Sequence, residues 1–267
     1  MTFVSEVFDR EPVVKDDKHY ALSVPEGYSK GLMIRDKDED PIGGFAKAFD
    51  LPLIPRSEWA SRIEEIERTK SRLSDISYAA GIECLDQNGT NYCWANAPVY
   101  CVELLRLASG LGDNRLSPAS VAAPIKNYQN RGGWGTQALK YIVNNGIVPA
   151  DKWPCNAIDR AYYTEENKII AKEYSVTEWY DLEDKNFEQL MTCLILRIPV
   201  AVGYNWWLHE VSAIDALVLG KDEFGIRIRN SWGMRYGKDG YAILTEEKAA
   251  SDDAVAPRVA ISYPEKQ

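Results

Sequence analysis

The strongest constraint on the fold of this chain is a change of hydrophobic period near residue 196. Before that point, apolar residues recur at helical spacing over about 57–73, from 93, from 117, over 136–145 and over 186–196. After it, they follow the spacing of strands at 199–204, 210–219, 225–230, 241–245 and 258–263. Helices first and strands second predict an α+β protein with a helical lobe and a sheet lobe, and a cleft between such lobes is a common place for a functional site.

Residues 1–55 show no sustained period, and prolines divide the stretch at positions 12, 25, 41, 52 and 55. Proline interrupts helices and the centres of sheets, so we expect an extended N-terminal arm here with no core of its own. The rest of the chain, 56–267, is expected to form one domain. Its helical lobe is predicted at about 56–170 and its sheet lobe at about 171–267.

The charge and hydropathy of the chain exclude two classes of partner. The formal net charge is −9 and no basic patch stands out, so no nucleic acid is expected to bind. The most apolar stretch, 190–202, is interrupted by Arg197 and Pro199 and is too short to span a membrane. Asp9 and Arg10 precede any apolar segment that could form a signal peptide. We therefore expect a cytoplasmic, non-secreted protein, or one packaged from the cytoplasm into a virion.

Cysteine and histidine counts limit the available chemistry. The five cysteines form an odd set without CxxC pairs, at positions 84, 93, 101, 155 and 193. This pattern argues against a disulfide framework and against a zinc knuckle. With only His19 and His209, a histidine-rich metal site is also excluded. No metal and no cofactor are predicted.

Three positions carry chemistry that is ambiguous when each is taken alone. Cys93 begins an apolar helix, where backbone N–H groups stabilise a thiolate, but a small buried cysteine fits the same place. His209 begins a strand and reads equally well as a hydrogen-bonded core histidine. Asn230 reads equally well as the turn that ends a strand.

The order of these residues along the chain is more specific than any one of them. The sequence presents, in turn, Gln87, Cys93-Trp94, Leu116-Ser117, Gly132-Gly133, His209, Asn230-Ser231-Trp232-Gly233 and Gly240-Tyr241. This ordered set resembles the papain family of cysteine peptidases over about residues 81–246. The resemblance implies a two-lobed fold with an antiparallel sheet lobe and an active site in the cleft between the lobes.

The resemblance also implies a role for each matched polar residue. Cys93 would be the nucleophile, and proton transfer to His209 would give a thiolate–imidazolium pair. Asn230 would hold the imidazole in one tautomer. Gln87, together with the backbone N–H of Cys93, would stabilise the oxyanion.

Five further residues are implied in substrate binding. Gly132 and Gly133 would let an extended peptide pair with the cleft wall, and Trp232 would cover the contact between Asn230 and His209. Trp206 and Trp207 lie in an unusually short segment before His209. They either narrow the cleft for apolar side chains or only pack beneath the sheet.

The family's disulfide near the nucleophile is missing, because its two positions are Thr90 and Asn130 in this sequence. Its absence is consistent with a reducing compartment. No matched catalytic position is changed.

The expected activity is a thiol endopeptidase that hydrolyses a polypeptide substrate through a thioester on Cys93. Two alternatives stay open: a structural or assembly component, for example of a phage-like particle, and an acyl-transfer or deamidation enzyme. The arm over 1–55 would either cross the cleft as a pro-segment or reach outward as a strap that docks an assembly partner. Since no compact inhibitory helical domain can be read there, the sequence favours the strap.

Overall fold

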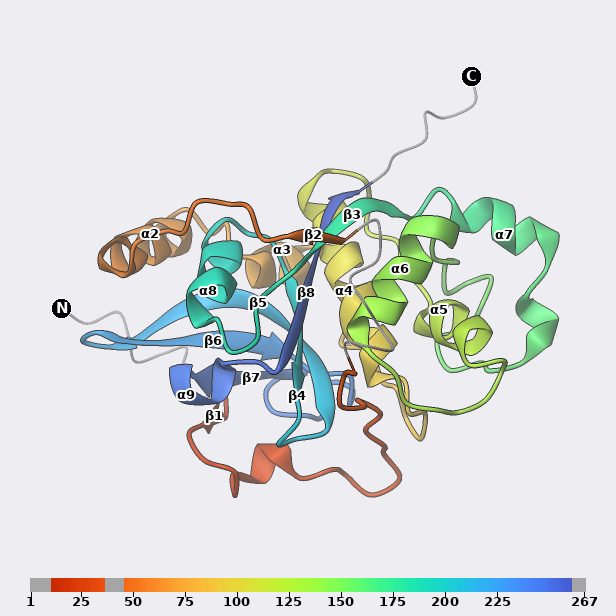
Figure 1. The fold of residues 1–267 in the computed structure, drawn as a ribbon, viewed down its shortest axis with the longest axis horizontal. Helices are drawn as coiled ribbons and strands as arrows, with labels where there is room; N and C mark the ends of the chain where they lie inside the picture. The colour runs from red at the N-terminus through yellow and green to blue at the C-terminus, as the bar shows by residue number, and fades with distance from the viewer. Residues whose placement is uncertain (1–10, 37–45, 261–267) are drawn as a thin grey trace.

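The computed structural model describes residues 11–36 and 46–260 and shows an α+β architecture (Figure 1). The helices are α2 (Arg56–Arg68), α3 (Leu73–Ala79), α4 (Cys93–Ala108), α5 (Pro118–Ile125), α6 (Gly135–Asn145), α7 (Glu165–Ala171), α8 (Phe187–Ile195) and α9 (Glu246–Ala249). The strands are β1 (Val13–Val14), β2 (Ala46–Ala48), β3 (Val176–Asp181), β4 (Val200–Tyr204), β5 (His209–Gly220), β6 (Glu223–Arg229), β7 (Tyr241–Thr245) and β8 (Asp253–Ala260).

One sheet of eight strands organises the molecule, in the order β1-β7-β6-β5-β4-β8-β3-β2. From β7 to β3 every pair is antiparallel, whereas the short edge strands β1 and β2 pair in parallel with β7 and β3. Both edge strands come from the N-terminal arm. The arm therefore adds a strand to each side of the sheet.

The two faces of the sheet carry different helices. Along β4, Val200 and Val202 join one core cluster and Ala201 joins another, as the alternation of side chains along a strand requires. The first cluster includes Trp59 of α2 and Met191 of α8, and the second includes residues of α4 and α6. Helix α4 thus lies against the sheet, with α5 and α6 beside it on the same side (Figure 1).

The structure differs from the sequence prediction in several elements. The predicted helix 57–73 ends at Arg68 and a second helix, α3, follows it. Helix α2 packs on the sheet and not in a helical lobe that begins at 56, because its buried Trp59 contacts Phe224 of β6 edge-on. Strands β1, β2 and β3 and helices α7 and α9 were not predicted. The last strand spans 253–260, whereas the prediction was 258–263, of which 261–263 lie outside the described residues.

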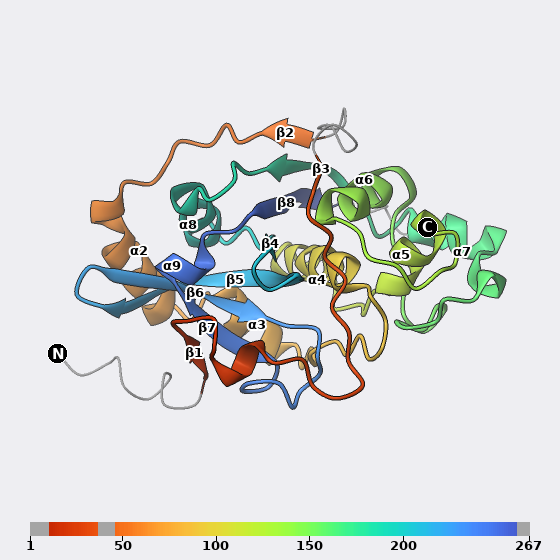
Figure 2. The same ribbon diagram turned by 60° about the horizontal axis from the view of Figure 1, so that its bottom comes forward.

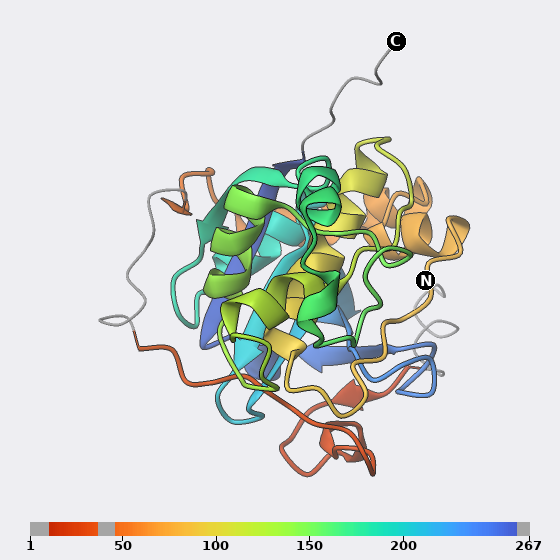
Figure 3. The ribbon, with the colours of Figure 1, turned by 90° about the vertical axis from the view of Figure 1, so that its right-hand side faces the viewer.

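The described part of the arm packs against the rest of the molecule, and Val14, Ala21 and Leu22 are buried in the core cluster on one face of the sheet. After β1 and a short 3-10 turn (Tyr20–Leu22), the chain runs across the molecule toward α6, as the red segment in Figure 2 shows. Figure 3 shows the same segment passing along one edge of the molecule. We call residues 27–36 the crossing segment. Residues 1–10 and 37–45 of the predicted arm lie outside the described residues.

Within the described part of the chain, no helix combines the length and the apolar character that a bilayer crossing needs.

Candidate active site

The thiol of Cys93 lies at the first residue of α4 and is fully buried. The backbone N–H groups of Glu210, Trp94 and Leu32 lie near the sulfur and favour its charged form, which lowers the pKa of the thiol. Glu210 directly follows His209 at the start of β5, so the helix and the sheet bring the predicted nucleophile and base to one place. Leu32 belongs to the crossing segment, which therefore reaches the sulfur itself.

The imidazole of His209 is held in one tautomer. Its Nε2 lies 2.7 Å from Oδ1 of Asn230, and the backbone N–H of Ser231 donates to the same oxygen at 2.7 Å. Because that oxygen only accepts, Nε2 carries the proton and Nδ1 has a free lone pair. Nδ1 is buried and has no hydrogen-bond partner among the described residues. It is the basic atom of the ring.

Aromatic rings enclose this imidazole on two sides. Trp232 stacks on it at 4.5 Å between centroids, and Trp207 meets it edge-on at 4.8 Å. Both indoles are almost fully buried, and Trp206, which is partly buried, stacks on Trp207. The rings shield the Asn230–His209 bond from water. This arrangement favours the packing interpretation of Trp206 and Trp207 over a direct role in lining the cleft.

The side chain of Gln87 is fixed from both ends. Its Oε1 accepts from the hydroxyl of Ser231 at 2.5 Å. Its Nε2 donates to the carbonyl oxygens of Thr90 and Ser29, each at 2.8 Å. Ser29 belongs to the crossing segment, and its carbonyl oxygen also accepts from Trp232 Nε1 at 3.3 Å. A carbonyl of the chain itself therefore takes the donor that an oxyanion would need.

Gly133 pairs through its backbone with the crossing segment. Its N–H donates to Gly31 at 3.0 Å, and its carbonyl accepts from Met33 at 3.1 Å, which makes a parallel bridge centred on Leu32. A Cβ at Gly133 would lie 2.7 Å from the ring of Trp94, so only glycine fits here.

Gly31 is just as tightly constrained. A Cβ at this position would lie 2.1 Å from the carbonyl oxygen of Asn91, two residues before the nucleophile. Gly132 also approaches Gly31 closely, since a Cβ at Gly132 would lie 2.5 Å from its carbonyl oxygen. The crossing segment thus lies directly on the backbone beside Cys93.

Burial keeps both reactive groups neutral in this closed arrangement. Removal from water raises the pKa of the Cys93 thiol, because the thiolate loses hydration. Burial lowers the pKa of His209 to about 3, the bond to Asn230 opposes this, and the charge of Lys30 adds to the lowering. A thiolate–imidazolium pair is therefore disfavoured while the crossing segment is in place.

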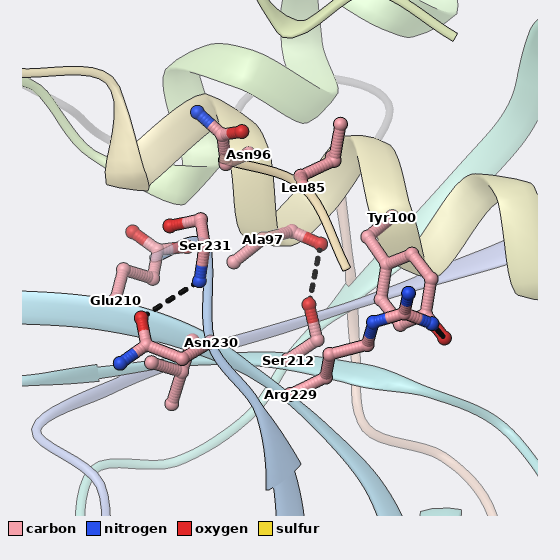
Figure 4. Close-up of a pocket in the computed structure, with 10 residues that line it drawn as sticks. Leu85, Asn96, Ala97, Tyr100, Glu210, Ser212, Arg229, Asn230 and Ser231 are labelled. Carbon is pink, nitrogen blue, oxygen red and sulfur yellow. Dashed lines mark hydrogen bonds between the residues drawn. The ribbon is translucent and has the colours of Figure 1, made fainter. Parts of the chain in front are cut away.

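A small cavity lies on the inner side of the site, between α4 and strands β5 and β6 (Figure 4). Its volume of about 10 Å³ corresponds to one water-sized sphere, and Glu210, Asn230 and Ser231 line it. Ser212 closes it by donating to the carbonyl of Ala97 at 3.0 Å. The cavity is therefore large enough for about one water molecule.

Hydrogen bonds join the segments that a disulfide would join in the family. Asn130 Oδ1 accepts from the N–H of Asn91 at 2.6 Å, and its Nδ2 donates to the carbonyl of Gly89 at 2.9 Å. Thr90, at the other position of the missing bridge, donates its hydroxyl to Gln87 at 2.7 Å. All five cysteines are free thiols.

The structure brings together the four predicted catalytic positions and both glycines. It also places residues beside them that sequence reasoning missed: Ser29, Lys30 and Leu32 of the crossing segment, Ser231 behind Gln87, and Glu210 beside the thiol. Glu210 and Ser231 adjoin predicted residues, so their polar side chains were visible signals. In the described residues, no group of three or more His, Cys, Asp or Glu side chains is arranged to hold a metal ion.

Comparison with known proteins relates the chain to one family. No protein-family model matches it. Zingipain-1 of Zingiber officinale is 23% identical over 68% of this chain and 90% of its own length. Macrodontain-1 of Ananas macrodontes is 26% identical over 65% of this chain and 88% of its own. Among solved structures, Xylellain, a cysteine protease from Xylella fastidiosa, has a TM-score of 0.61 at 18% identity, over 87% of this chain and 96% of its own.

These relatives match in sequence and in fold, and the curated ones include other plant proteases and cathepsins at similar identity. The α+β fold expected from the sequence is thereby confirmed. In sequence and in fold, the chain is similar at low identity to papain-like cysteine proteases.

Proposed function

We propose that the chain is a thiol endopeptidase that forms a thioester on Cys93 and is latent while its crossing segment covers the site. The observation that carries the proposal is the tautomer of His209. With Nε2–H bonded to Asn230 and Nδ1 without a partner among the described residues, the ring is set to accept a proton from a thiol.

The reaction proceeds in two halves. Cys93 gives its proton to Nδ1 of His209 and its sulfur attacks the peptide carbonyl, while Gln87 Nε2 and the N–H of Cys93 stabilise the oxyanion. The C–N bond then breaks, and the amine leaves with the proton from the imidazolium. Water attacks the thioester, His209 takes the water proton, and the acid is released as the sulfur regains a proton.

The contacts of the crossing segment support the pro-segment alternative over the outward strap that the sequence favoured. Ser29 takes the Gln87 donor, Gly31 and Met33 take the backbone of Gly133, and Leu32 reaches the sulfur. Each of these groups is one that a substrate would need. Displacement of the segment would also admit water, which stabilises the thiolate and the imidazolium.

Product profiling on a peptide library tests the activity. The full chain is expected to release peptides with free carboxylates, and Cys93→Ala and His209→Ala are expected to lower the rate by about a thousandfold or more. Products that are amides of an added amine would show acyl transfer instead. A profile identical to that of Cys93→Ala in a Gly31→Ala chain, whose added Cβ displaces the crossing segment from Asn91, would contradict the proposal and favour a structural role.

A further inference from the structure

Two carboxylates bind Arg35 at the end of the crossing segment beside the site. Arg35 donates to Asp181 at 2.8 Å and to Asp253 at 3.1 Å, and the three side chains are at least 93% buried. Asp181 ends β3 and Asp253 begins β8, so the sheet holds these two carboxylates in fixed positions. A buried ion pair of this kind needs good geometry, because both partners lose hydration.

Glu210, Gly203 and Asp253 lie in one line on neighbouring strands, and we call these three residues a row of the sheet. Gly203 of β4 lies opposite Glu210 on one side and opposite Asp253 on the other. Directly opposed residues place their side chains on one face, so the two carboxyl groups flank the bare backbone of Gly203. Glu210 is 98% buried, and its Oε2 has no hydrogen-bond partner among the described residues. The row therefore has acceptor capacity that Arg35 does not use.

The space above Gly203 is filled by the crossing segment. The side chain of Leu32 lies 3.1 Å from the place where a Cβ of Gly203 would be. Leu32 also reaches the Cys93 sulfur through its N–H, so this space adjoins the nucleophile. Two residues of the arm thus fill one continuous site: Leu32 supplies an aliphatic group over Gly203, and Arg35 supplies a cation at Asp181 and Asp253.

We infer that Gly203, Glu210, Asp253 and Asp181 form a substrate subsite for a long basic side chain, arginine or lysine. This inference rests on the proposed peptidase function. One such side chain combines the two groups that the arm supplies separately, an aliphatic stem and a cationic head. The stem would lie where Leu32 lies, and the head would lie among the three carboxyl groups. The arm then acts as an internal occupant of this subsite.

The first test removes the Arg35 side chain from the full chain and replaces it with a small cation in solution. Arg35→Ala empties the acidic end of the subsite and is expected to raise the rate of Cys93 alkylation by iodoacetamide about tenfold. Ile34→Ala, at an exposed neighbour, is the matched control and should leave the rate near wild type. Added methylguanidinium should slow alkylation of the Arg35→Ala chain, whereas its neutral analogue methylurea should not. Equal effects of the two compounds would overturn the inference.

The second test measures selectivity directly. The substrates are pairs of quenched peptides, and the two members of a pair carry arginine or its neutral isostere citrulline at the same position before the scissile bond. Each position is tested in turn. At one of these positions, the full chain should cleave the arginine peptide with a kcat/KM about tenfold or more above that of the citrulline peptide. Asp253→Asn and Asp181→Asn should bring that ratio near one. Glu178→Gln, which removes a carboxylate of β3 paired with Arg258 outside the subsite, should keep it.

The outcomes separate this inference from the proposed function. Because each ratio is measured within one protein, partial loss of folded protein does not change it. If the wild type hydrolyses the peptides but its arginine-to-citrulline ratio of kcat/KM is near one at every position, the subsite inference is overturned and the proposed peptidase function stands. Absence of hydrolysis of every peptide by the Arg35→Ala chain, although iodoacetamide alkylates Cys93 in that chain, overturns the peptidase and the subsite with it.

Discussion

At the scale of single residues, burial controls the chemistry of the site. His209 and Cys93 are both enclosed, and burial disfavours the charged form of each. Asp253 is under the same influence, since burial raises its pKa to about 6 although Arg35 opposes the shift. The carboxyl group that binds Arg35 of the arm therefore titrates near pH 6.

The raised pKa of Asp253 gives a prediction for stability against pH. Between about pH 4 and pH 6, the folded chain holds a proton at this group that the unfolded chain releases, so the free energy of unfolding should fall as the pH rises. A pKa raised from 3.8 to about 6 corresponds to about 3 kcal/mol over this range. Chemical denaturation at pH 4 and at pH 6 measures the change in the free energy of unfolding between them, and this change should be less negative in Asp253→Asn than in the wild type by about that amount. Parallel curves for the two proteins would contradict the assignment.

The residues of the site were predicted to different degrees, for a physical reason. Cys93, His209, Asn230 and Gln87 stand in a fixed order along the chain, and that order is visible in the sequence. Asp181 and Asp253 meet only because β8 lies between β3 and β4, and strand order is not written in local periodicity. The acidic subsite could therefore be seen only in the folded molecule.

At the scale of elements, the sequence predicted those whose apolar period is strong. Helices α4, α5, α6 and α8 and strands β4 to β7 lie within a few residues of their predicted ranges. Strands β1 and β2 are two and three residues long and take their partners from distant β7 and β3, so they have no period to detect. Helix α2 was predicted as a helix of the helical lobe, whereas it packs on the sheet through Trp59.

The crossing segment is the element whose position decides access to Cys93. A Cβ on Gly31 would collide with the backbone of Asn91, which cannot move without shifting the start of α4. Gly31→Ala should therefore displace the segment and raise the rate of Cys93 alkylation by about tenfold or more, since exposure then becomes the resting state. The measurement is mass spectrometry of each labelled cysteine against time.

Gly89→Ala is the matched control for this substitution. Gly89 lies in the loop before α4, where its carbonyl accepts from Ser29 of the crossing segment, but its Cβ would make only an ordinary contact at 3.5 Å with Gly27. Its labelling rate should stay close to that of the wild type. Equal acceleration in both variants would mean that the segment is displaced by general loosening of the loop and not by the collision at Gly31.

At the scale of the whole molecule, the arm is part of the fold on both sides of the site. Before the crossing segment, Glu11 forms a buried ion pair with Arg227 at 3.0 Å, and Arg227 also binds Asp215 at 2.8 Å. After it, β2 joins the sheet edge beside β3. Opening of the site can therefore be local to residues 27–36, while both flanks stay attached.

Because the arm is attached in this way, we predict that substitutions of two of its carboxylates lower the free energy of unfolding by different amounts. Glu11→Gln removes a buried charge from Arg227 and should lower the free energy of unfolding by about 3 kcal/mol. Asp17→Asn removes an exposed partner of Lys248 and should cost less than about 1 kcal/mol. Urea denaturation measures both. A Glu11→Gln chain as stable as Asp17→Asn would show that the arm is only loosely attached.

The most direct measurement of the central claim is the rate of peptide hydrolysis by the Gly31→Ala full chain, with and without Cys93→Ala. We predict hydrolysis by Gly31→Ala at a rate above that of the wild type, because the same displacement that exposes the thiol frees Gln87 and Gly133 for substrate. The double variant should fall to the background rate. If the Gly31→Ala chain alkylates readily at Cys93 but hydrolyses peptides no faster than the double variant, the account of a latent thiol peptidase is contradicted.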